Sequence, residues 1–220
     1  MQQVFVHGLG QTPASWQKTI AQMSCTGQTI CPDLAALLSG REVSYQSLYR
    51  AFADSCNQAA QPIDLCGLSL GGVLALQYAL EQPDKVGSLV LIATPYRMPK
   101  RLLKLQNLLF RLLPEAAFAQ MGWPKAAVLR LCASMAALDF SHSLQAVACP
   151  VMVLCGARDR ANKKASRDMA GMLRNAELHI IEGAGHEVNR DAPEKLAAAL
   201  DAFYQRSAPP AVERETRLIE

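Results

Sequence analysis

Residues 65–72 read LCGLSLGG and place a single serine, Ser69, among three glycines. The apolar residues before this stretch predict a short buried strand, and the run VLALQYALEQ after it has apolar side chains at helical spacing. Ser69 therefore lies where a strand turns abruptly into a helix, and Gly67 and Gly71 remove side chains where the two arms meet. This pattern is typical of a nucleophile elbow. A glycine-rich turn whose serine only caps the helix has the same composition, so the stretch alone leaves both interpretations open.

Strand and helix signals alternate outward from this point in both directions. Short β-rich runs predict six strands, at 4–6, 29–31, 63–66, 86–92, 151–155 and 178–181, and helical spacing follows at 14–23, 45–60, 73–82 and 193–204. Continuous apolar strands that alternate with helices predict an α/β fold. We expect a mostly parallel sheet of about six strands, covered by helices on both faces.

Residues 95–140 interrupt the alternation, because strand signals vanish there and the sequence becomes helical. The segment is too long for an ordinary connection, which predicts a helical insertion with its own packing. The core of the domain is then expected at 1–94 and 141–206. Residues 207–220 are rich in proline and charge, and we expect a flexible tail.

Composition places the chain among globular proteins, with 50% hydrophobic and 19% charged residues in a length of 220. Seven cysteines lack CxxC spacing, and several lie in apolar runs, which predicts reduced, buried thiols and no zinc site. No apolar run is long enough to cross a membrane, and no signal peptide is visible at the N-terminus. We therefore expect a cytoplasmic protein.

A nucleophilic serine needs a base, and the chain offers histidines at 7, 142, 179 and 186. His186 lies in a glycine-flanked loop just past the last predicted strand, where a side chain can reach the carboxyl edge of a parallel sheet. His179 falls inside a strand, His142 follows the insertion, and His7 is expected to brace its loop. His186 is therefore the predicted base.

The base in turn needs a carboxylate to orient it. Asp159 directly follows the fifth predicted strand, whereas Asp64 lies within a strand and Asp139 ends the insertion. Asp159 is therefore the better candidate. The chain order Ser69, Asp159, His186 is that of a serine hydrolase triad on an open α/β sheet.

The charge of a tetrahedral intermediate also requires two hydrogen-bond donors. One is predicted to be the backbone N–H of Leu70, directly after the serine at the start of a helix. The other is expected in the loop HGLG after the first strand, where glycines let the backbone curl toward Ser69 and make the N–H of Leu9 the natural donor.

With HG at 7–8, Trp16, GLSLGG at 67–72, GARD at 156–159 and GAGH at 183–186, residues 3–204 resemble the α/β-hydrolase superfamily. The chain is similar to the small capped branch of esterases, lactonases and cofactor-free haloperoxidases. The resemblance implies the α/β-hydrolase fold, with residues 95–140 as a cap over the active site. It also implies that the two antiparallel strands that usually precede the HG strand are absent, which leaves one sheet edge less protected.

These features predict a serine hydrolase that cleaves a carboxylic ester or thioester through an acyl-enzyme, with no metal and no organic cofactor. Two alternatives stay open. The same scaffold supports C–C bond hydrolysis, lyase chemistry or perhydrolysis. A ligand-binding protein that retains the triad with little turnover is the other.

The net charge of +3 is too small to predict nucleic acid as a partner. Residues 94–140 nevertheless carry seven basic and two acidic side chains, a net of +5. The expected partner is therefore a small-molecule acyl substrate, and whether it is anionic or bound to an acidic carrier stays open, as does a contact of these cations with an anionic membrane surface. Whether an oligomer covers the exposed sheet edge is also open.

Overall fold

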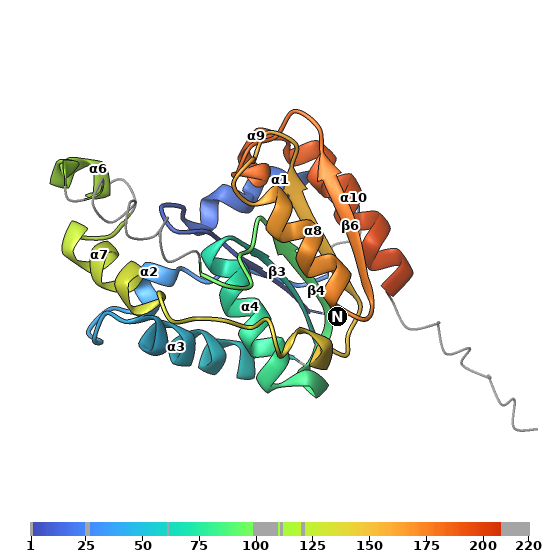
Figure 1. Ribbon diagram of the computed structural model, residues 1–220, viewed down its shortest axis with the longest axis horizontal. Coiled ribbons are helices and arrows are strands. Elements are labelled where there is room, and N and C mark those ends of the chain that lie inside the picture. Colours follow the sequence, from blue (N-terminus) through green and yellow to red (C-terminus); the bar gives the residue numbers. More distant parts are fainter. Residues whose placement is uncertain are drawn as a thin grey trace, which may run out of the picture.

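A six-stranded parallel sheet forms the centre of the molecule, with strand order β2-β1-β3-β4-β5-β6 (Figure 1). The computed structural model describes residues 2–24, 27–60, 62–98, 110, 112–119 and 122–207. The strands are β1 (Gln2–Val6), β2 (Thr29–Ile30), β3 (Ile63–Leu68), β4 (Val86–Ile92), β5 (Val151–Gly156) and β6 (Ala176–Ile181). The predicted fold class is confirmed, and each predicted strand forms within two residues of its expected bounds.

Helices cover both faces of this sheet (Figure 1). One face carries α3 (Tyr45–Asn57), α4 (Leu70–Glu81) and α8 (Lys163–Met172), and the other carries α1 (Gln17–Gln22) and α10 (Pro193–Ser207). Shorter elements among the described residues are η1 (Pro13–Trp16), α2 (Leu34–Leu37), η2 (Pro83–Lys85), η3 (Leu144–Ala146) and α9 (Val188–Asp191). None of the described helices is long and apolar enough to span a lipid bilayer.

Alternation of side chains along each strand divides the core into two layers. On β3, Leu65 packs in the layer with α3 and α4, whereas its neighbour Cys66 packs in the layer with α10. Both side chains are fully buried. The sheet is thus mainly apolar on both faces, as the continuous apolar strands predict, apart from a few buried polar side chains such as Asp64 and Ser88.

The β2 edge of the sheet is protected by its shortness. This strand has only two residues, which pair with Gln3 and Val4 of β1. A short edge strand presents few free backbone groups to a foreign strand. The shortness of β2 therefore limits the exposure of this sheet edge.

The insertion between β4 and β5 contains α6 (Glu115–Ala119) and α7 (Lys125–Ser134). Its two ends pair with each other: the N–H of Met98 donates to Leu138 O at 3.0 Å, and the N–H of Phe140 donates to Tyr96 O at 2.8 Å. This antiparallel stem, with its bridge between Arg97 and Asp139, differs from the purely helical prediction.

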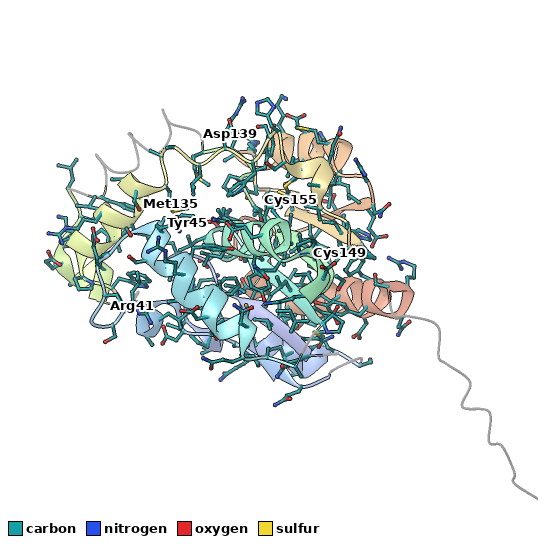
Figure 2. All side chains as sticks on the ribbon, turned by 90° about the horizontal axis from the view of Figure 1, so that it is seen from below. Arg41, Tyr45, Met135, Asp139, Cys149 and Cys155 are labelled. Atoms are coloured by element: carbon teal, nitrogen blue, oxygen red, sulfur yellow. The ribbon has the colours of Figure 1, made fainter. Side chains whose placement is uncertain are left out.

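Helix α7 is also tied to the core. Ser134 Oγ accepts the N–H of Tyr45 at the start of α3, at 2.8 Å. Met135, the next residue, belongs to the same buried cluster as Tyr45, and both are labelled in Figure 2. Most of the predicted first helix of the insertion, including Lys100, Lys104 and Arg111, lies outside the described residues. The tail is predicted to begin at residue 207, but Ser207 still belongs to α10, and residues 208–220 lie outside the described part.

Candidate active site

Ser69 lies on a strained turn between β3 and α4. Its backbone has φ 54° and ψ −113°, a conformation that costs a side-chain-bearing residue on the order of 1–3 kcal/mol. The N–H of Ser69 donates to Ile92 O at the end of β4, at 2.8 Å, which ties the turn to the sheet. The hydroxyl makes no capping hydrogen bond to α4. The alternative in which Ser69 only caps the helix is therefore wrong.

The glycines around Ser69 are required by close backbone contacts. A Cβ on Gly67 would overlap the backbone of Gly71, and a Cβ on Gly71 would overlap the carbonyl of Val6 on β1. A Cβ on Gly72 would overlap the side chain of Thr94, just after β4. The elbow thus brings β1, β3 and β4 so close that only glycine fits, which explains the glycine pattern of the sequence.

Asp159 and His186 meet at the carboxyl edge of the sheet, where β5 and β6 end. His186 Nδ1 lies 2.8 Å from Asp159 Oδ2. The Asp159 side chain is 4% exposed and that of His186 is 44% exposed. A buried carboxylate thus faces a more exposed imidazole, which leaves Nε2 of the ring free of this bond. Because the sheet is parallel, Ser69 after β3 lies at the same edge.

Backbone hydrogen bonds explain why the two loops converge. The N–H of Ala157 donates to Ile181 O, and the N–H of Arg158 donates to Ala184 O, each at 2.9 Å. A Cβ on Gly156 would overlap the carbonyl oxygens of Ala184 and Gly185. The loops that follow β5 and β6 are thus held together by backbone contacts, and these contacts place Asp159 beside His186.

Asn162 is a third member of this cluster that the sequence patterns do not single out. Its Nδ2 lies 2.8 Å from Asp159 Oδ2 and 3.1 Å from Oδ1, and its backbone N–H donates to Oδ1 at 3.2 Å. Burial raises the pKa of Asp159, but the hydrogen bonds from His186 and Asn162 together outweigh burial and hold that pKa below its ordinary value. Asp159 is therefore ionised at neutral pH. An asparagine three residues after the carboxylate was the available signal.

The loop after β1 packs against the elbow. A Cβ on Gly8 would lie 2.8 Å from Leu68 Cδ2 and 3.5 Å from Ser69 Cβ. The loop is braced by His7, whose Nδ1 lies 2.9 Å from Gly8 O and whose Nε2 accepts the N–H of Leu34 at 3.2 Å. Burial lowers the pKa of His7, and the bond accepted at Nε2 requires a neutral ring. This agrees with the bracing role expected from the sequence.

The two predicted oxyanion donors belong to different segments. Leu9 belongs to the loop that follows β1, and Leu70 is the first residue of α4. The first intrahelical bond of α4 runs from the N–H of Val73 to Ser69 O, and the amides that precede it in a helix lack intrahelical acceptors. The N–H of Leu70 therefore has the character of a helix N-terminal donor.

The other candidate histidines and carboxylates have different surroundings. His179 lies on β6 beside Glu177, and His142 is exposed in a turn. Asp64 is buried in β3 and accepts a hydrogen bond from Ser88 Oγ at 2.6 Å, and Asp139 belongs to the stem of the insertion. Among the described residues, no group of three or more His, Cys, Asp or Glu side chains is placed to hold a metal ion.

The sheet, the strained serine turn and the loop arrangement define a hydrolase of the α/β type. The chain belongs to the alpha/beta hydrolase family, whose family model matches residues 3–199.

Two curated esterases and one solved esterase structure are similar to this chain. A pimeloyl-acyl-carrier-protein methyl ester esterase of Aliivibrio salmonicida (strain LFI1238) is 31% identical over 94 residues, which cover 43% of this chain and 36% of that protein. The chain thus spans just over a third of this relative. The enzyme of the same name from Nitrosomonas europaea is 25% identical and is matched over 91% of this chain and 94% of its own length. A thermophilic esterase from Thermogutta terrifontis superposes with a TM-score of 0.77 at 21% identity, covering 95% of this chain and 91% of that chain.

Proposed function

We propose that this protein is a serine hydrolase that cleaves a carboxylic ester or thioester through an acyl-enzyme. Ser69 Oγ attacks the carbonyl carbon of the substrate while His186 Nε2 takes the hydroxyl proton. The carbonyl π bond opens, and its electron pair moves to oxygen as an oxyanion. The N–H groups of Leu9 and Leu70 donate to that oxyanion.

The second half of the reaction regenerates the serine. The tetrahedral intermediate collapses, the bond to the alkoxide or thiolate breaks, and His186 returns its proton to the leaving group. Water then attacks the acyl-enzyme with His186 as base, which releases the acid and restores Ser69. Asp159 stays ionised throughout, holds the imidazole through Nδ1, and stabilises the imidazolium that forms transiently.

One observation carries this proposal: a serine in a strained elbow at the end of β3, with a carboxylate–imidazole pair of 2.8 Å at the ends of β5 and β6. Such strain needs a compensating reason, and presentation of a nucleophile above a sheet is a known one. A solely structural turn gains nothing from a serine at φ 54°, because glycine fits there without strain.

The proposal extends to an acidic acyl substrate, either a carboxylate-bearing ester or an acyl group on an acidic carrier. The names of the Aliivibrio and Nitrosomonas relatives specify a methyl ester attached to acyl-carrier protein. The net charge of +5 over residues 94–140, which contain the segment that the family resemblance implies to be a cap, supports the same substrate class, because a basic cap would attract anionic substrates. A cytoplasmic location also belongs to the proposal, since no disulfide joins the cysteines that the structure describes.

A fluorophosphonate probe and a panel of p-nitrophenyl esters test the proposal. We expect the probe to label Ser69, and Ser69→Ala to lose turnover by a factor on the order of 10⁶ with the fold intact. Anionic esters are expected to show a KM that rises with salt, whereas the KM of neutral esters stays level. A Ser69→Ala protein that keeps more than about one per cent of the activity would refute the assignment of the nucleophile.

A further inference from the structure

A buried pair of side-chain amides joins the first loop of the chain to the last. Gln11 Nε2 donates to Asn189 Oδ1, and Asn189 Nδ2 donates back to Gln11 Oε1, each at 3.1 Å. Gln11 is 1% exposed and Asn189 is fully buried. The two residues are 178 positions apart, so this reciprocal pair is a long-range connection that the sequence patterns do not reveal.

On one side the pair holds the loop that carries Leu9. Residues 8–11 form a tight turn in which the N–H of Gln11 donates to Gly8 O at 3.2 Å, and Gly10 has φ 82°. Gln11 Oε1 also accepts the N–H of Gly8 at 3.4 Å. The side chain of Gln11 thus holds the His7–Gly8 peptide, while its backbone N–H holds the carbonyl of the Gly8–Leu9 peptide, which carries the N–H of Leu9.

On the other side the pair holds the loop that carries His186. Asn189 lies in the one-turn helix α9, three residues after His186. Asp191, at the end of α9, accepts the N–H of Gly185 at 2.6 Å, which ties this turn back to the residue before His186. A displacement of Asn189 therefore shifts the backbone that carries the imidazole.

The two amide residues also make hydrogen bonds to side chains of η1 and α1. Ser15 Oγ donates to Gln11 Oε1 at 3.2 Å, and Asn189 Nδ2 lies at the same distance from Ser15 Oγ. Thr19 Oγ1 donates to Asn189 O at 3.4 Å. Figure 1 shows α9 close to α1 on the same side of the sheet. Buried amides with this many partners form a rigid unit, since any movement leaves a polar group unpaired.

We propose that Gln11 and Asn189 are positioning residues that fix the Leu9 N–H relative to the His186 imidazole. The proposal rests on the serine hydrolase function given above. The oxyanion donor and the base come from opposite ends of the chain, yet they must act on the same tetrahedral intermediate. A misplacement of about 1 Å between such groups costs on the order of 100-fold in rate. The amide pair is a direct link between the two loops.

The test measures the rate constant for labelling of Ser69 by a fluorophosphonate, which needs the nucleophile, the base and the oxyanion donors but no knowledge of the natural substrate. The variants are Gln11→Ala, Asn189→Ala, the double variant, and the exchanged pair Gln11→Asn with Asn189→Gln, which keeps two amides and the same number of methylenes. Tyr78→Phe is the matched control, because it removes another long-range hydrogen bond of a fully buried side chain, to Asn57 Oδ1 at 3.0 Å. Urea unfolding is measured for each protein.

We expect each alanine variant to label Ser69 about 10- to 100-fold more slowly. The double variant is expected to label Ser69 no more slowly than the slower of the two single variants, because all three variants break the same link between the loops. The exchanged pair should recover part of the rate. Tyr78→Phe should lose comparable stability and keep its rate.

One outcome would contradict the positioning role, and a different outcome would contradict the serine hydrolase function. Alanine variants that label within twofold of the wild-type rate, or that slow only in proportion to lost stability as Tyr78→Phe does, would overturn the positioning role. A wild-type protein that is not labelled at Ser69 would instead overturn the serine hydrolase function, and with it the inference that rests on it.

Discussion

At the scale of single residues, the backbone conformation of Ser69 lowers the stability of the protein. Ser69 has a side chain and nevertheless adopts a positive φ of 54°. Among the described residues, the other non-glycine residue with a positive φ is Ala93, just after β4, at 48°. Both follow the carboxyl ends of neighbouring strands, where the chain must turn sharply. The strain is borne by the packing of the glycines and the sheet around it.

Replacing Ser69 with glycine should therefore stabilise the protein relative to replacing it with alanine. Alanine keeps the Cβ and the strain at φ 54°, whereas glycine adopts this conformation freely. We expect Ser69→Gly to have a free energy of unfolding about 1 kcal/mol higher than Ser69→Ala, after the larger backbone entropy of glycine in the unfolded chain is subtracted. Urea unfolding of the two variants gives the comparison, and equal stabilities would show that the elbow is unstrained.

At the scale of elements, the geometry of the elbow depends on how closely α4 approaches β1. Gly71 lies in the first turn of α4 against the carbonyls of Val6 and His7. A side chain there must push the helix away from the strand, and both the position of Leu70 and the loop after β1 change with it.

Gly71→Ala should consequently destabilise the protein by about 3 kcal/mol or more, because the added Cβ meets backbone that cannot yield. The control is Gly171→Ala in α8, where a Cβ meets nothing within 4 Å. That change should raise the free energy of unfolding by about 0.5–1 kcal/mol through helix propensity. Chemical unfolding of both variants tests this contrast, and a mild loss at Gly71 would mean that α4 is free to shift.

The sequence predicts the strands and turns that have a clear local pattern of apolar residues or glycines. It does not predict contacts between segments that are distant in the chain. The apolar runs of β3 and β5, the glycines near Ser69 and the positions of Asp159 and His186 after strands follow from local chemistry. The stem that joins Met98 to Leu138 has no local strand signal, because its hydrogen bonds depend on where β4 and β5 place the two chain ends. Asn162 follows its carboxylate closely, yet its role depends on the convergence of two loops.

At the scale of the whole molecule, a buried carboxylate sets part of the dependence of stability on pH. Asp64 on β3 is 5% exposed, and its register neighbours in the sheet are Gln3 and Ser88. Burial raises the pKa of Asp64, and the hydrogen bond from Ser88 only partly offsets this. The folded state therefore holds the proton of Asp64 to a higher pH than the unfolded chain does.

The sign of the effect follows by linkage. The favourable contribution of protonated Asp64 is complete below its unfolded pKa, about 3.9, and is lost as the pH rises through the raised folded pKa. Asp64→Asn carries no such titration and can still accept from Ser88. We expect the wild-type protein to lose stability relative to Asp64→Asn as the pH rises from 4 toward 7. Urea unfolding across this range measures the difference, and a difference that is constant with pH would contradict the burial argument.

The stem between residues 96–98 and 138–140 has a consequence for how this molecule can diversify. Because the two arms pair with each other, the segment between them begins and ends at adjacent backbone positions. For a loop whose two ends are held together in this way, the entropy of closure costs only about 0.6 kcal/mol more for each doubling of its length. Residues can therefore be added between the arms while β4 and β5 keep their register, because the stem already sets where the two chain ends lie.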